Sequence, residues 1–95
     1  ANKYPAPTIT GADVTAANAS YYIASAGGIT ITLPASPSAG NYVIIKDGTG
    51  AAATTTFTVA RNGSNITSSA TDLVFDKNYA QVVMTYIDGT IGWSI

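Results

Sequence analysis

The feature that most constrains the fold of this chain is the regular spacing of its turn signals. Glycine, proline and asparagine turn signals recur roughly every 8 to 12 residues, and short runs rich in β-branched and aromatic residues lie between them. One run, residues 29–33, alternates strictly, which places Ile29, Ile31 and Leu33 on one buried face. The pattern predicts about eight short strands, at residues 20–24, 29–33, 42–46, 57–60, 65–67, 72–75, 80–87 and 91–95.

Three dipeptides predict tight turns between these strands. Gly27-Gly28 is expected to turn residues 20–24 into residues 29–33. Asn62-Gly63 predicts a hairpin that returns along residues 65–67, and Asp88-Gly89 predicts a second hairpin at the C-terminus. The near-continuous apolar run at 42–46 is typical of a strand that is covered on both faces or lies centrally in a sandwich.

No window shows a helical period of apolar residues, and the best helical candidate, residues 13–20, lacks large apolar side chains. We therefore expect an all-β fold with no substantial helix: a small antiparallel sandwich, a jelly-roll-like fold or a barrel, which the sequence does not separate. Residues 13–95 are expected to form a single β domain. Residues 1–12 carry Pro5, Pro7 and Gly11 and are expected to form an extended arm outside any regular element.

The residues that most catalysis requires are missing. The chain has no His, no Cys and no Glu, so the usual general bases, a thiolate nucleophile and soft metal ligands are absent together. Asp47 precedes a glycine-rich turn, but it lacks the Lys of a phosphate loop and the further carboxylates of a calcium site. Asp72 and Asp76 flank one expected strand and are interpreted as turn-capping residues. We expect no enzyme activity, no cofactor and no metal.

The charge pattern excludes other classes of partner. Only 9% of the residues are charged, and four scattered cations with a net charge of −1 do not form a phosphate-binding patch, so no nucleic-acid partner is expected. No stretch is long and apolar enough to span a membrane, so no membrane is expected as a partner. A weakly charged surface suits a protein that lives in an assembly, although threonine-rich exposed strands also follow from strand propensity alone.

Candidate contact residues lie in two places. The arm is expected to lie on a neighbouring subunit, and adjacent tyrosines in the strand at 20–24 must point to opposite faces, so at most one is buried. The predicted partner-binding residues are Tyr4, Pro5, Pro7, Ile9, Tyr21 and Tyr22.

The order of several motifs adds a resemblance. The runs GITITLP at 28–34, AGNYVIIKDG at 39–48, VARNGSNI at 59–66 and VMTYIDGTIGWSI at 83–95 resemble a small β-module of tailed-bacteriophage virion proteins. The resemblance spans about residues 20–95 and implies a capsid decoration or cement protein: a homo-oligomer, preferably a trimer, that binds the major capsid protein or other virion proteins on the outer surface of the virion. The alternative it implies is the tip of a tail fibre or spike, which would bind a host receptor or glycan through the loops at 34–40 and 48–56.

Overall fold

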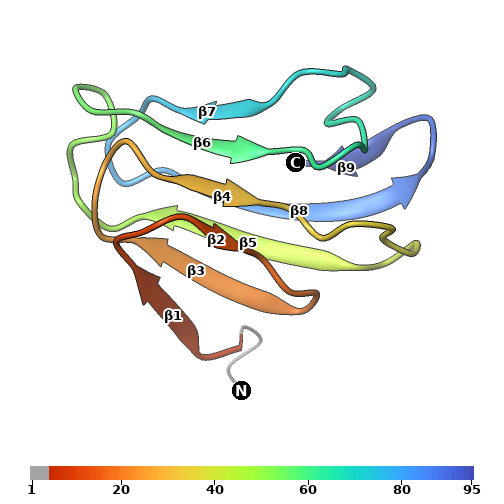
Figure 1. The fold of residues 1–95 in the computed structure, drawn as a ribbon, viewed down its shortest axis with the longest axis horizontal. Coiled ribbons are helices and arrows are strands. Elements are labelled where there is room, and N and C mark those ends of the chain that lie inside the picture. Colours follow the sequence, from red (N-terminus) through yellow and green to blue (C-terminus); the bar gives the residue numbers. More distant parts are fainter. Residues whose placement is uncertain (1–4) are drawn as a thin grey trace.

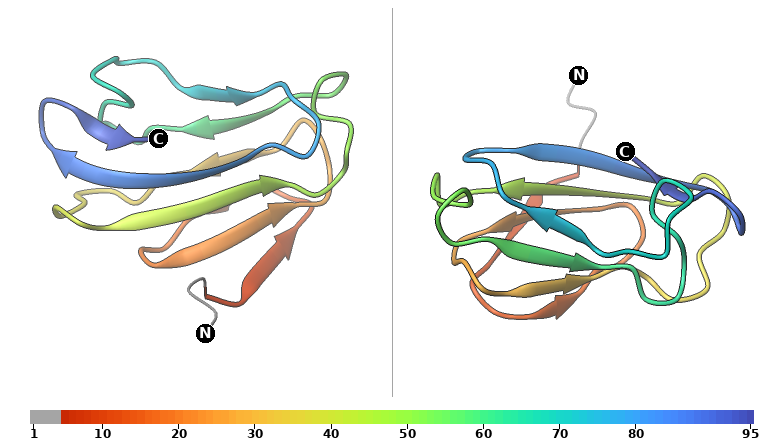
Figure 2. Two further views of the ribbon diagram at one scale, coloured as in Figure 1. Left: turned by 180° about the vertical axis from the view of Figure 1, so that it is seen from behind. Right: turned by 90° about the horizontal axis from the view of Figure 1, so that it is seen from above.

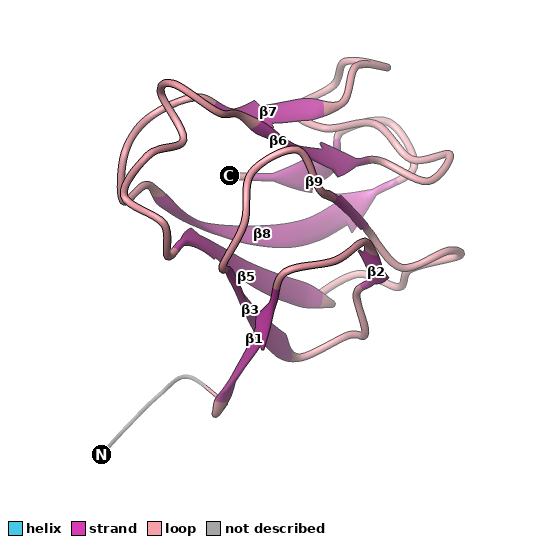
Figure 3. Ribbon diagram, turned by 60° about the vertical axis from the view of Figure 1, so that its left-hand side comes forward, coloured by secondary structure: helices cyan, strands magenta, loops and turns pink. Residues whose placement is uncertain are grey.

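The computed structural model describes residues 5–95, and over this range the chain is all-β, with nine strands in two sheets and no helix (Figures 1 and 3). The five-stranded sheet has the order β1-β3-β5-β8-β9, and the four-stranded sheet has the order β2-β4-β6-β7. The strands are β1 (Pro7–Thr10), β2 (Val14–Thr15), β3 (Ser20–Ala24), β4 (Thr30–Thr32), β5 (Tyr42–Asp47), β6 (Phe57–Ala60), β7 (Leu73–Phe75), β8 (Gln81–Asp88) and β9 (Gly92–Ser94).

The first six strands wind alternately through the two sheets. Each strand therefore pairs in parallel with the next but one: β1 with β3 and β3 with β5 in one sheet, β2 with β4 and β4 with β6 in the other (Figure 2). The expectation of an antiparallel fold is wrong for this part of the chain. The reason is that Gly27-Gly28 does not close a hairpin but carries the chain from one sheet to the other, so the opposite sheet serves as the crossover that parallel pairing needs.

The last three strands reverse the direction and make both sheets mixed. β7 pairs antiparallel with β6, β8 with β5, and β9 with β8. The predicted hairpin at Asp88-Gly89 is confirmed: the Asp88 Oδ1 atom accepts hydrogen bonds from the backbone N–H groups of Thr90 (2.9 Å) and Ile91 (2.7 Å). The sheets do not form a closed barrel, which corrects that alternative.

The core lies between the sheets. The prediction that Ile29, Ile31 and Leu33 share a buried face is confirmed, and all three belong to one apolar cluster to which strands of both sheets contribute. The phenyl rings of Phe57 and Phe75 stack with their centroids 4.5 Å apart and join β6 to β7. The central position of β5 is confirmed as well.

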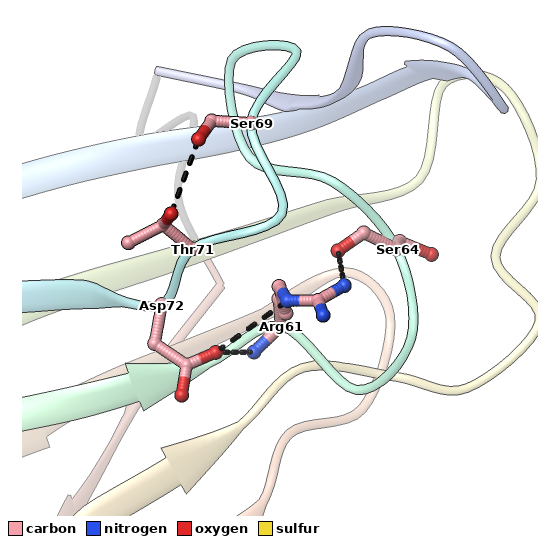
Figure 4. Close-up of polar contacts among 5 residues, drawn as sticks. All are labelled: Arg61, Ser64, Ser69, Thr71 and Asp72. Carbon is pink, nitrogen blue, oxygen red and sulfur yellow. Dashed lines mark hydrogen bonds and ion pairs between the residues drawn. The ribbon is translucent and has the colours of Figure 1, made fainter.

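The segment between β6 and β7 differs from the predicted hairpin. Asn62 (φ 50°) and Gly63 (φ 87°) adopt the positive φ angles expected of their turn, but residues 65–67 do not return along β6, whose antiparallel partner is β7. The segment folds over β9 instead, where Ile66 forms an isolated bridge to Trp93. Its two ends are tied together because the backbone N–H of Arg61 donates to Asp72 Oδ1 (3.0 Å), as Figure 4 shows.

The N-terminal segment also differs from the prediction. Pro7–Thr10 form an edge strand of the five-stranded sheet, so the expectation that this part of the arm lies outside any regular element is wrong. Proline and threonine fit this place because an edge strand needs backbone donors on one side only. Residues 13–20, the best helical candidate, contain the short strand β2.

Candidate functional site

The side chains of the five-stranded sheet that point away from the core form an apolar surface. The strand register aligns Ile9 with Ile23, and it aligns Tyr21 with Ile44 and Val83 across three neighbouring strands. Because side chains at alternate positions of paired strands share a face, these residues lie on one side of the sheet. We call this surface the outer face; its apolar members are Pro7, Ile9, Tyr21, Ile23, Tyr42, Ile44 and Val83.

The outer face is partly covered by its own side chains. Tyr21 on β3 donates its hydroxyl hydrogen to Gln81 Oε1 on β8 over 2.9 Å, and β5 runs between those two strands. The tyrosine therefore spans β5, where Ile44 is only 1% exposed although it lies outside the core cluster. Ile9 stays 69% exposed and Val83 stays 39% exposed. Two strands of the sheet thus present aliphatic side chains to solvent.

The outer face carries little charge. Among its outward positions on β1, β3, β5 and the paired part of β8, one residue is charged, Lys46. The Lys46 Nζ atom donates to the backbone carbonyl of Tyr79 over 3.1 Å. That contact holds the ammonium group at the end of β5, towards the loop that precedes β8.

The outward side of the four-stranded sheet has a different character. The register aligns Thr30 with Thr58 and Val74, and it aligns Thr15 with Thr32. Threonine satisfies strand propensity and keeps a hydroxyl group for water. The interpretation that threonine-rich strands simply face solvent therefore fits this sheet, and it does not account for the outer face of the other sheet.

The structure brings together three of the predicted contact residues, Pro7, Ile9 and Tyr21, on the outer face. The prediction that at most one of the adjacent tyrosines is buried is confirmed. Tyr22 points inward, is 7% exposed, and its hydroxyl oxygen accepts a hydrogen bond from the backbone N–H of Ala17 (3.0 Å). Tyr22 is therefore a core residue and not a contact for a partner, because the core already encloses it.

Two further predicted contacts lie elsewhere. Pro5 is half-buried and precedes β1, and Tyr4 lies outside the described residues. Sequence reasoning missed four residues of the outer face, Ile23, Tyr42, Ile44 and Val83. The available signal was the run at 42–46, whose apolar residues occupy both faces of one strand; the partners on β3 and β8 depend on a parallel register that the sequence did not indicate.

A second polar cluster surrounds the buried carboxylate of Asp47. Asp47 is 0% exposed at the end of β5. Its Oδ1 atom accepts hydrogen bonds from the backbone N–H (2.9 Å) and the hydroxyl (2.6 Å) of Thr49, and its Oδ2 atom accepts from the N–H groups of Tyr79 (3.0 Å) and Ala52 (3.3 Å). Both oxygens are therefore engaged by donors of the protein itself, and the carboxylate joins the loop after β5 to the loop before β8.

These contacts set the acidity of Asp47. Burial raises the pKa of the carboxyl group, but hydrogen bonds from the Thr49 side chain and from the backbone of Thr49, Tyr79 and Ala52 outweigh it and lower the pKa from 3.8 to about 2. The charged form is thus the one that the fold stabilises.

A pH dependence of stability follows from this shift. Between pH 3.8 and pH 2 the unfolded chain binds the Asp47 proton and the folded chain does not, so the free energy of unfolding falls as the pH drops through this window. We expect the free energy of unfolding to lose about 2 kcal/mol from this group, in a decline that begins near pH 5 and is complete near pH 1. Urea unfolding at a series of pH values measures it, and the same series on Asp47→Asn supplies the baseline. Parallel pH profiles for the two proteins would contradict the assignment.

Tyr79 lies beside this cluster and is exposed. It is 66% exposed and has a positive φ of 59°, which is unusual for a bulky residue. Hydrogen bonds hold its backbone on both sides, through its N–H to Asp47 and its carbonyl to Lys46. Its ring lies against Gly50, where a Cβ atom would overlap the phenol. An aromatic side chain is therefore presented on an anchored backbone, next to the predicted ligand loop at 48–56.

The two sheets also leave an apolar pocket of about 150 Å³ between β7 and β8. Its lining includes the apolar residues Leu73, Phe75 and Val82 and the charged residues Asp76 and Lys77. It is separate from the outer face, because Phe75 and Val82 belong to or pack against the core cluster.

Within residues 5–95, no three acidic side chains come together in a way that would hold a metal ion. The described part of the chain contains no helix long and apolar enough to cross a membrane. Comparison of the sequence with models of known protein families and with curated proteins finds no match.

Proposed function

We propose that this protein is a non-enzymatic structural component of a tailed-phage particle, most simply a decoration or cement protein on the outside of the capsid. It acts by packing its outer face against other protein subunits. In this proposal it binds neither nucleic acid nor membrane, and its fold is a two-layer sandwich in which six strands depart from the antiparallel jelly-roll pattern.

The observation that carries the proposal is the contrast between the two sheets. The outer face carries apolar residues on four neighbouring strands and presents Ile9 and Val83 to solvent, whereas the four-stranded sheet carries threonine on three of its strands and one exposed valine, Val74. Large exposed apolar patches on monomeric proteins mark interaction sites. The resemblance of residues 20–95 to virion modules supports the kind of assembly, and the sparse charge of the whole chain agrees with it.

The test uses particles of the tailed phage that encodes the chain, prepared without its gene. We expect the purified protein to sediment with these particles and to saturate at a fixed number of copies per head. Electron microscopy of particles that carry the labelled protein then shows where on the particle it binds. Protein that stays in the supernatant at micromolar concentration would overturn the proposal.

Tyr79 favours the tail-fibre or spike tip as a second candidate. An exposed aromatic ring on an anchored backbone is a low-entropy contact for a ligand. In this role the ring stacks on a host-surface sugar, and Asn78, whose Oδ1 accepts from Ala53 N–H over 3.0 Å, borders it. We expect binding on a glycan array to fall at least tenfold in Tyr79→Ala and to persist in Tyr42→Ala. A blank array, or label confined to phage heads, would count against this candidate.

A further inference from the structure

We propose that Asn62 is a site of spontaneous covalent modification in the folded protein. Its side-chain amide is converted to a carboxylate through a cyclic imide that forms with the backbone nitrogen of Gly63. Both residues are exposed, on the turn that follows β6. The site is separate from the outer face, and the proposed function neither assigns the modification nor depends on it.

The reaction is an attack by the nitrogen of the next residue. The Gly63 nitrogen forms a bond to Asn62 Cγ and loses its proton to water or hydroxide. The Cγ–Nδ2 bond breaks, and Nδ2 takes up a proton and departs as ammonia. Water then opens the imide at either carbonyl, which yields aspartate or isoaspartate. A following glycine favours the attack because it has no Cβ atom to crowd the nitrogen.

The fold leaves this nitrogen free and engages the equivalent nitrogen at every other asparagine in residues 5–95. The residue after each of those asparagines donates its backbone N–H: Ala19 to the Tyr42 carbonyl (2.8 Å), Tyr42 to Asn18 Oδ1 (3.0 Å), Ile66 to the Ser69 carbonyl (2.9 Å) and Tyr79 to Asp47 Oδ2 (3.0 Å). Within the same range, the N–H of Gly63 donates no hydrogen bond. Asn62 is therefore the asparagine of this range whose neighbouring nitrogen is available for attack.

The geometry of the turn explains the free nitrogen. Residues 61–64 form a β-turn that is closed by a hydrogen bond from Ser64 N–H to the Arg61 carbonyl (3.2 Å), and Arg61 Nη1 donates to the Ser64 carbonyl (3.3 Å; Figure 4). Such a turn joins its outer residues and leaves the N–H groups of the two central residues unused. Asn62 and Gly63 occupy the central positions, with φ angles of 50° and 87°.

One hydrogen bond of the Asn62 side chain opposes the reaction and is lost through it. Asn62 Nδ2 donates to the Leu33 carbonyl over 2.9 Å, which ties the turn to the segment after β4. The amide must leave this contact before the attack. In the product, a carboxylate oxygen replaces Nδ2 opposite the carbonyl oxygen, and neither oxygen carries a hydrogen to donate. Because the ammonia is lost to solvent, the modification unties the turn from Leu33 and does not reverse.

Two aspartates also precede glycine, and both are poorer sites. The N–H of Gly48 donates to the Ala24 carbonyl over 2.9 Å, so the nitrogen after Asp47 is engaged. At Asp88, two backbone N–H groups hold Oδ1. A carboxylate is also a weaker electrophile than an amide, because attack adds charge to a group that is already negative.

Peptide mass spectrometry of the folded protein, stored for days in mildly alkaline buffer, tests the site. We expect Asn62 to change from amide to carboxyl at least about tenfold faster than any other asparagine in residues 5–95. We expect its product to separate into aspartyl and isoaspartyl peptides. A parallel sample in concentrated urea shows that the assay detects conversion of Asn62. An intact Asn62 in the folded protein overturns the inference, and so does equally fast conversion of another asparagine in this range.

Asn62→Asp reproduces the aspartyl product and tests its consequence. We expect it to raise the equilibrium constant for unfolding about tenfold, as the loss of one hydrogen bond predicts. Asn41→Asp is the matched control, because Asn41 Oδ1 accepts from Ser38 N–H over 3.0 Å and a carboxylate keeps that role. Urea unfolding compares the two variants. Equal effects of the two substitutions would contradict the release of the turn from Leu33.

Discussion

Gly92→Ala is expected to destabilise this fold severely. Gly92 opens β9 with a φ of 74°, and a Cβ atom there would overlap the backbone carbonyl of Asn65. That carbonyl is not free to move, because it accepts a hydrogen bond from Trp93 N–H over 2.8 Å. We expect the free energy of unfolding to fall by about 3 kcal/mol or more, in the range of severe overpacking.

Gly28→Ala is the matched control for this prediction. Gly28 has the same φ of 74°, but no atom lies within 4 Å of the position of an added Cβ. Gly28→Ala is therefore expected to lose only the cost of the strained backbone, about 1 kcal/mol of unfolding free energy. Urea unfolding followed by the fluorescence of the single tryptophan, Trp93, measures both variants. Equal losses would mean that the segment before β7 is not held against β9 as described.

Asp47→Asn is expected to have the next largest effect. It should lower the free energy of unfolding by about 3 kcal/mol at neutral pH. Both carboxylate oxygens of Asp47 accept hydrogen bonds. Oδ1 accepts two from Thr49, and Oδ2 accepts one each from the backbone N–H groups of Tyr79 and Ala52. An amide has one acceptor oxygen, so its NH₂ group must face donors whichever way it is turned. In either orientation the substitution leaves at least one backbone N–H beside the buried side chain without its acceptor.

Asp88→Asn tests the same chemistry where only one oxygen is used. Asp88 accepts from Thr90 and Ile91 through Oδ1 alone and is exposed, so an asparagine oxygen replaces it. We expect Asp88→Asn to change the free energy of unfolding by less than about 1 kcal/mol. Chemical denaturation at pH 7 compares the two variants. A similar small loss for Asp47→Asn would show that the buried carboxylate contributes little to joining its two loops.

Much of the strand content follows from local signals. Residues 20–24, 42–46 and 57–60 were predicted as strands and form β3, most of β5 and β6, because β-branched and aromatic residues between turn signals favour extended backbone wherever they lie. The turn at Asn62-Gly63 has the predicted positive φ angles for the same local reason. Whether such a turn closes a hairpin is not local, and here it does not.

Three of the seven apolar residues of the outer face, Pro7, Ile9 and Tyr21, were named from the sequence. Strand alternation separates Tyr21 from Tyr22, so sequence reasoning placed them on opposite faces. It named Pro7 and Ile9 as contacts for another reason, because they lie in the expected N-terminal arm, and the structure places both on β1. It did not assign Ile44 and Val83 to the same surface. Their assignment requires the register of β5 with β8, which pairs residues about forty positions apart in the chain.

The sequence by itself determined an all-β chain, the positions of most strands, and the lack of the side chains that most catalysis uses. Those properties depend on residue type and on neighbours within a few positions. Only the tertiary structure decided that the first six strands pair in parallel through two sheets, that Asp47 is buried among donors from two loops, and that one sheet turns an apolar face outward. The physical reason is that the alternation of apolar and polar residues indicates which residues share a side of one strand. Strand order and register depend on how the whole core packs.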